Sequence, residues 1–191
     1  MLTPTEDEIA AVVDCYRRGW LTQGPGVRDL ESALGGLFSC HARVVATPTA
    51  ALHLILRVLG VGSADEVTVV ERRRGEDLPS RRERHRPVVE EVTGLLDGRP
   101  AALAGDLAYL SFAGPLGLGS GGAVLTASAE QADLVASLRS HAMTSGTWER
   151  HHGREETYDV VDLGYNYRFD EPRAVLALAR LAALGARVET R

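Results

Sequence analysis

The sequence predicts an α/β protein in which helices pack on a layered sheet, and three observations lead to this fold class. Apolar residues recur at helical spacing in several segments, short apolar runs typical of strands stand between them, and the two kinds of segment alternate along the chain. This alternation is typical of α/β proteins. With 191 residues, 45% hydrophobic and 25% charged, the chain has the composition of one globular domain, which we expect over residues 1–191.

Helix signals are clearest at the two ends of the chain. Thr5–Glu8 reads T-x-x-E, a capping box, and predicts a helix that runs to about Arg18. A proline in the first turn, Pro172, marks the start of a final alanine- and leucine-rich helix. Apolar spacing places the helices at about 6–18, 27–37, 51–59, 129–140 and 170–184, and the strands at about 43–46, 67–70, 88–89, 107–112 and 123–126.

One segment departs from this composition. Residues 71–86, ERRRGEDLPSRRERHR, hold seven arginines, four acidic residues and one proline, and their only apolar side chain is Leu78. Such a segment cannot form core, and mixed charge at this density is typical of a solvated loop.

All 21 basic residues counted as lysine or arginine are arginine, so the chain contains no lysine. This excludes mechanisms that need a side-chain amine, such as a covalent bond to a carbonyl cofactor or a phosphate-binding P-loop lysine. The net charge of −5 argues against nucleic acid as a partner.

Two cysteines without a CxxC motif favour free thiols in a reducing cytoplasm over a disulfide framework or a structural zinc site. The acidic start of the chain and the absence of a long apolar run predict neither a signal peptide nor a membrane span.

Four segments, taken in order, resemble one known family. They are GWLTQGP at Gly19–Pro25, TAALHL at Thr49–Leu54, GGAVLT at Gly121–Thr126 and LGYNYR at Leu163–Arg168. Together they are similar to the signature segments of the DegT/DnrJ/EryC1/StrS sugar aminotransferases. The resemblance covers most of the chain apart from residues 71–86.

The resemblance implies a specific architecture and chemistry. Members of this family are fold-type I pyridoxal phosphate (PLP) enzymes, usually dimers with the active site at the subunit interface, that act on nucleotide-linked keto-sugars. This chain is about half as long as they are. We therefore expect a three-layer α/β/α sandwich, a trimmed large domain that lacks the C-terminal small domain and in which the Arg-rich loop 71–86 replaces a deleted block.

Three of the family's cofactor positions are altered here. The stretch in which the family has its PLP-binding lysine corresponds to residues 113–120, AGPLGLGS, which contain no amine. The phosphate-binding Ser-Gly-Thr corresponds to Thr47–Thr49, where Pro48 has no N–H to donate. Glu91 stands where the family has an aspartate for the pyridine nitrogen. From these changes we expect no PLP binding and no cofactor.

The candidate site residues follow partly from the resemblance and partly from their chemistry. We expect Glu91 to act as general acid or base, with Tyr165, Tyr167 and His141 as further catalytic groups. The substrate would be bound by Thr49, Trp148, Asn166 and Arg168; by resemblance, Asn166 would reach a phosphate across the dimer interface.

Other groups have simpler interpretations. Glu90 and Glu91 are neighbours in a strand, so only one of them can face the cleft, and the sequence leaves open which. His53 is interpreted as a satisfied interior histidine. The polar loop with His151, His152, Glu155 and Glu156 is interpreted as solvated, and we expect no metal.

Two functions are compatible with the sequence. The first is a cofactor-independent acid–base enzyme of bacterial specialised metabolism, of the cyclase, lyase or isomerase type, that reuses the cleft for a small-molecule substrate. The second is a non-catalytic pseudoenzyme that binds and regulates a full-length aminotransferase. With either function we expect a cytoplasmic homodimer, because removal of a domain exposes apolar surface.

Overall fold

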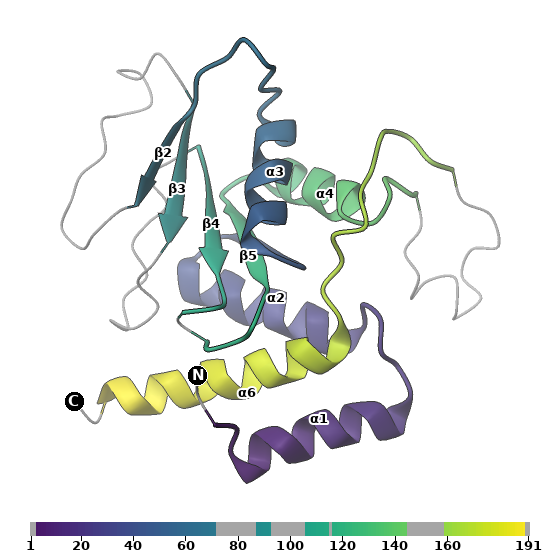
Figure 1. Ribbon diagram of the computed structural model, residues 1–191, viewed down its shortest axis with the longest axis vertical. Coiled ribbons are helices and arrows are strands. Elements are labelled where there is room, and N and C mark those ends of the chain that lie inside the picture. Colours follow the sequence, from purple (N-terminus) through teal and green to yellow (C-terminus); the bar gives the residue numbers. More distant parts are fainter. Residues whose placement is uncertain (1–2, 72–86, 93–105, 115, 145–158, 190–191) are drawn as a thin grey trace.

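The computed structural model describes residues 3–71, 87–92, 106–114, 116–144 and 159–189. Within these ranges the strands form one sheet in the order β1-β5-β4-β3-β2 (Figure 1). Their bounds are β1 His41–Val45, β2 Thr68–Glu71, β3 Val88–Val92, β4 Leu107–Ser111 and β5 Gly122–Thr126. The layered α/β fold expected from the sequence is confirmed.

The directions of the strands determine which of their ends meet. β2, β3 and β4 are parallel to one another, while β5 is antiparallel to both β4 and β1. β1 therefore runs in the same direction as β2, β3 and β4, and the carboxyl ends of these four strands lie at one edge of the sheet. The reversed direction of β5 was not predicted from the sequence, because apolar runs carry no information on strand direction.

Helices cover both faces of the sheet, which gives the three layers that the resemblance implied (Figure 1). One face packs against α2 (Pro25–Phe38) and α6 (Glu171–Glu189), through a core that includes Leu30, Leu34 and Phe169. The other packs against α3 (Pro48–Val58) and α4 (Ala129–Leu138), through a second core that includes Leu54 and Ile55. α1 (Glu6–Arg18) lies outside these layers and packs on α6.

The helix ends explain why these segments are helical. Thr5 and Glu8 form the predicted capping box of α1, and Gly19 ends that helix in the left-handed region with φ 75°. α2 begins with Pro25, and its Gly26 and Val27 N–H groups donate to the carboxylate of Glu171, at 2.5 and 3.2 Å. Sequence reasoning could not find this cap, since the acceptor lies about 145 residues away.

A buried ion pair connects α1 and α6 to the segment between β4 and β5. Arg180 in α6 contacts Glu8 of α1, with nitrogen–oxygen distances of 3.4 Å, and both side chains are more than nine-tenths buried. The Arg180 guanidinium also donates to the carbonyls of Leu116 and Gly117, at 2.9 and 2.8 Å. The segment that follows β4 is thereby held by a helix from the end of the chain.

Each helix and strand that the sequence predicted is present, with ends that differ by a few residues. The interpretation of residues 71–86 as a loop that replaces a deleted block concerns a segment outside the described residues, except that Glu71 ends β2. That interpretation stays a prediction.

Candidate functional site

The N-terminus of α3 lies at the edge where the carboxyl ends of β1, β2, β3 and β4 meet, because α3 follows β1 directly. Thr47 caps the helix, its hydroxyl accepting from the Ala50 N–H at 3.0 Å. Pro48 has no N–H, so an anion at this helix end would meet the N–H and hydroxyl of Thr49, which is exposed. In open α/β sheets, ligands bind at the carboxyl ends of the strands.

The segment between β4 and β5 lies against this helix start. Ser120 donates its hydroxyl to the Ala46 carbonyl at 2.9 Å. A Cβ on Gly122 would lie 2.8 Å from the Leu110 carbonyl oxygen and 3.1 Å from the Pro48 Cα, so only glycine allows this close approach. The end of residues 113–120, the stretch that by resemblance corresponds to the family's lysine segment, is therefore adjacent to α3.

The structure decides which of the two neighbouring glutamates faces α3. Glu91 is in register with Tyr109 on β4, and Glu90 with Ala108. Tyr109 belongs to the core under α3 and Ala108 to the core under α2 and α6. Because residues in register on adjacent strands share a face, Glu91 lies on the α3 face and Glu90 on the other, which settles the choice that the sequence left open.

Glu91 has a specific partner that sequence reasoning missed. The Tyr109 hydroxyl donates to Glu91 Oε2 at 2.9 Å, and Tyr109 itself is 8% exposed. The hydroxyl holds one carboxylate oxygen in place and leaves Oε1 for another donor. The register of two parallel strands could have indicated this pair, but only once their pairing is known.

Three aromatic rings gather beside α3. Tyr165 and Tyr167 stack with centroids 5.1 Å apart, and His53 of α3 meets the Tyr165 ring edge-on at 4.7 Å. His53 Nδ1 and the Tyr167 hydroxyl are 3.0 Å apart, within hydrogen-bond distance. The Ala46 N–H donates to the Tyr167 carbonyl at 2.9 Å, which fixes this group at the start of α3. The expected satisfaction of the His53 side chain is met by this hydrogen bond, although the side chain is only partly buried.

His141 contributes to this arrangement through its backbone. Its φ of 67° lies in the left-handed region, and its N–H donates to the Tyr165 carbonyl at 3.0 Å. Among the described residues, no hydrogen bond or ring contact joins the imidazole of His141, or the carboxylate of Glu91, to Tyr165 or Tyr167. Of the four expected catalytic residues, Tyr165 and Tyr167 thus lie together with His53, and Glu91 lies with Tyr109. His141 contacts Tyr165 through the backbone alone.

Two of the expected substrate-binding residues contact each other. Asn166 is exposed and its Oδ1 accepts from Arg168 Nε at 3.2 Å. Thr49 lies at the start of α3. Trp148 lies outside the described residues, as do His151, His152, Glu155 and Glu156.

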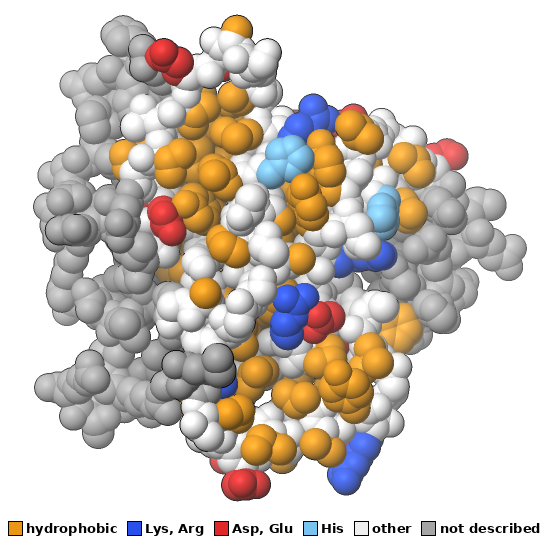
Figure 2. Space-filling view, viewed as in Figure 1, with side chains coloured by type: hydrophobic (Ala, Val, Ile, Leu, Met, Phe, Trp, Pro, Cys, Tyr) orange, Lys and Arg blue, Asp and Glu red, His pale blue; other side chains and the backbone are white. Residues whose placement is uncertain are grey.

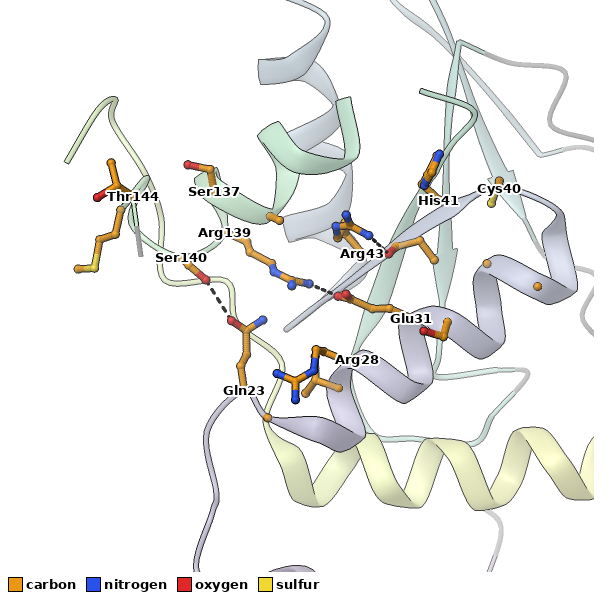
Figure 3. Close-up of a pocket in the computed structure, with 18 residues that line it drawn as sticks. Gln23, Arg28, Glu31, Cys40, His41, Arg43, Ser137, Arg139, Ser140 and Thr144 are labelled. Carbon is orange, nitrogen blue, oxygen red and sulfur yellow. Dashed lines mark hydrogen bonds and ion pairs between the residues drawn. The ribbon is translucent and has the colours of Figure 1, made fainter. Parts of the chain in front are cut away.

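A hollow of about 790 Å³ lies elsewhere, along the free edge of β1 (Figure 3). At its centre Arg139 forms a buried ion pair with Glu31 and donates to the Val44 carbonyl, while Glu31 accepts from the Val44 N–H at 3.0 Å. These two side chains bond the outward-facing backbone groups of the edge strand, so their role is structural. None of the expected site residues that the structure describes lines this hollow.

Two further properties concern the described residues alone. They contain no cluster of three histidine, cysteine, aspartate or glutamate side chains able to hold a metal ion. No helix among them has the length and apolar composition needed to cross a membrane.

Comparison with known proteins identifies the family. Residues 3–72 and 92–191 match the model of the DegT/DnrJ/EryC1/StrS aminotransferase family. The chain belongs to this family. It is 27% identical, over an alignment that spans 241 positions with its gaps, to the UDP-4-amino-4-deoxy-L-arabinose–oxoglutarate aminotransferase of Shewanella sediminis, and the alignment covers 94% of this chain and 62% of that relative. The chain thus spans less than two thirds of that relative.

Solved structures agree on the fold. The chain is similar to the sugar aminotransferase Spr1654 of Streptococcus pneumoniae in its pyridoxamine phosphate (PMP) form, with a TM-score of 0.76 and 21% identity over 96% of this chain and 67% of the other. It is equally similar to the aminotransferase TlmJ of Streptoalloteichus hindustanus, with a TM-score of 0.76 and 22% identity over 94% and 64%. The expectation of a trimmed fold-type I domain is consistent with these partial coverages.

The expectation that the chain has no cofactor is wrong by these comparisons. The family is one of aminotransferases, and Spr1654 has been solved in both PMP and PLP forms. The physical reason is that a lysine is only one of several groups that can hold such a cofactor. Contacts to the phosphate and to the ring nitrogen come from other groups, so the absence of a lysine and of one N–H does not by itself exclude binding.

Proposed function

We propose that this chain binds PMP or PLP non-covalently at the carboxyl edge of its sheet and catalyses an acid–base step on a small sugar-derived substrate. The observation that carries the proposal is the position of Glu91, on the α3 face at the end of a parallel strand and oriented by Tyr109. The sugar aminotransferases among its relatives support the substrate class.

The residues present fit such a cofactor. The positive end of α3, with the N–H and hydroxyl of Thr49, offers donors to a phosphate. Glu91 offers a carboxylate to a protonated ring nitrogen, with Oε2 fixed by Tyr109. When bound, the cofactor supplies an electron-withdrawing ring and, in the PMP form, the amine that the chain itself lacks.

The proton-transfer groups would be Tyr167 and His53. Their hydrogen bond of 3.0 Å allows a proton to move between the Tyr167 hydroxyl and His53 Nδ1. Stacking on Tyr165 holds the Tyr167 ring in position. The pair lies beside the start of α3, next to the proposed phosphate position.

A second candidate, a non-catalytic partner of a full-length aminotransferase, is favoured by one observation. Val160, Val161 and Leu163 are 61%, 66% and 69% exposed and directly precede the site segment. Apolar side chains that are close in the sequence and exposed to this degree are typical of protein–protein interfaces. The same surface would serve a homodimer, in which Asn166 of one copy approaches the site of the other.

Cofactor binding is the first test. Purified protein is titrated with PMP and with PLP by calorimetry, for the wild type, for Glu91→Gln and for a matched control, Glu130→Gln, which alters an exposed glutamate of α4. We expect saturable binding that Glu91→Gln weakens at least tenfold, about 1.4 kcal/mol, and that Glu130→Gln leaves unchanged. The proposal is refuted if neither PMP nor PLP shows saturable binding.

The acid–base step is tested separately, by solvent deuterium exchange into nucleotide-linked keto-sugars. Tyr167→Phe should slow the exchange by about 100-fold or more while PMP binding stays within twofold. If the wild type catalyses no exchange but alters the kcat of a full-length aminotransferase, and Val161→Glu abolishes that effect, the second candidate is correct.

A further inference from the structure

The outer face of α1 carries an apolar stripe that the described residues leave uncovered. Ile9, Val13 and Tyr16 are 45%, 39% and 60% exposed and follow one another at helical spacing. A different face of the helix, with buried Glu8 and Cys15, packs on α6. Figure 2 shows apolar side chains gathered over the part of the molecule where Figure 1 places α1 and α6.

Two unmatched charges flank this stripe. Glu6 and Arg17 are exposed, and neither has an ion-pair partner within the described part of the chain. Residues eleven apart on an α-helix lie on the same side, because about 3.6 residues make one turn, and are about 16 Å apart along the axis. Glu6 and Arg17 thus border the same edge of the stripe at its two ends.

The charges of α1 as a whole are also polarised. Its first turn contains Glu6, Asp7 and Glu8, and its last turn contains Arg17 and Arg18. Two copies of this helix packed in parallel would place like charges together. Packed antiparallel, each Glu6 approaches the other copy's Arg17, while Ile9 of one stripe meets Val13 and Tyr16 of the other.

We propose that α1 is a self-association surface that pairs antiparallel with α1 of a second copy of this chain. A two-fold axis near the middle of the helix brings the two stripes together and forms two equivalent Glu6–Arg17 ion pairs. The interface lies on a different surface from Val160–Leu163 and does not depend on the function of the α3 site.

The test measures the self-association constant of the full chain by sedimentation equilibrium. Val13→Glu should weaken association at least tenfold. Glu6→Arg and Arg17→Glu should each weaken it several-fold, because each places like charges together, and the double variant Glu6→Arg/Arg17→Glu should restore it to within twofold of the wild type. Glu130→Arg, an exposed charge reversal on α4, is the matched control and should have no effect. Circular dichroism checks that each variant is folded.

Three results would overturn the proposal. One is a wild-type protein that stays monomeric at concentrations up to 100-fold above the protein concentration of the calorimetric titrations. Another is a double variant as weak as the single variants. The third is association that withstands every α1 variant but is lost in Val161→Glu, which would assign the contact to residues 160–163. Rescue by the double variant cannot arise from misfolding, so it separates pairing of α1 from damage to the helix.

Discussion

At the scale of single residues, Gly164 shows how the site segment is held. A Cβ at this position would lie 2.1 Å from both the Ala142 nitrogen and the His141 carbonyl carbon, atoms of the backbone that cannot rotate away. The Gly-Tyr-Asn-Tyr-Arg motif therefore needs its glycine for close backbone approach. This approach sets the positions of Tyr165 and Tyr167 relative to α3.

Gly164→Ala is expected to lower the free energy of unfolding by about 3 kcal/mol or more, because the clash must displace backbone. Gly36→Ala is the matched control, since a Cβ there meets nothing within 4 Å in the helix α2. The control should raise stability by about 0.5–1 kcal/mol. Urea unfolding measures both changes, and equal stability of the two variants would contradict the argument.

Cys15 gives a prediction on pH. Burial, and secondarily the Glu171 carboxylate, raise the pKa of the Cys15 thiol above its ordinary 9.0. The folded state favours the neutral thiol, so the contribution to stability is complete below pH 9 and is lost as the pH rises toward the higher folded-state pKa. We expect the free energy of unfolding to fall more steeply above pH 9 in the wild type than in Cys15→Ala. Identical slopes would show that the thiol does not contribute.

At the scale of elements, the free edge of β1 is closed by side chains from two helices. Glu31 of α2 and Arg139, at the end of α4, form an ion pair with each other (Figure 3). Both side chains also bond the outward-facing backbone groups of Val44. Their side chains are 12% and 8% exposed. An edge strand with bonded backbone groups is protected from pairing with another chain.

Glu31→Ala should destabilise the protein by about 3–5 kcal/mol, since it leaves the Arg139 guanidinium buried and unpaired. Asp133→Ala removes the partner of Arg43, a pair in which the aspartate is 76% exposed, and should change stability by less than about 1 kcal/mol. Denaturant midpoints compare the two variants. Adding Arg139→Met to Glu31→Ala should recover part of the loss, and no recovery would argue against the buried charge as the cause.

At the scale of the whole molecule, the absence of lysine determines how a cofactor can be held. The only amine in the sequence is the α-amino group, since all 21 basic residues counted are arginine. We expect bound PLP to be removed by extensive dialysis, and borohydride reduction to leave at most one adduct per chain, on that amine. After the α-amine is blocked, intact-mass measurement should find no PLP adduct. Cofactor that stays attached would contradict non-covalent binding.

Much of the fold could be predicted from the sequence, because its determinants are local. The capping box at Thr5, the helical spacing of apolar residues and the short apolar runs between helices depend on neighbours in the chain. The family signature segments also indicated Thr49, Glu91 and Tyr165–Arg168 as site residues. That Glu91 rather than Glu90 lies on the α3 face was left open by the sequence and was decided by the register of β3 with β4.

Only the tertiary structure decided the contacts between distant residues. The reversed direction of β5, the Tyr109–Glu91 pair, the place of His53 beside Tyr167 and the Glu171 cap of α2 join residues from 11 to about 145 positions apart. The sequence by itself determined which segments form helices and strands and that no side-chain amine is present. The expectation of no cofactor, which came from the sequence, is wrong for the same physical reason. Cofactor binding depends on the combined geometry of several chain segments, and the loss of one binding group does not remove the others.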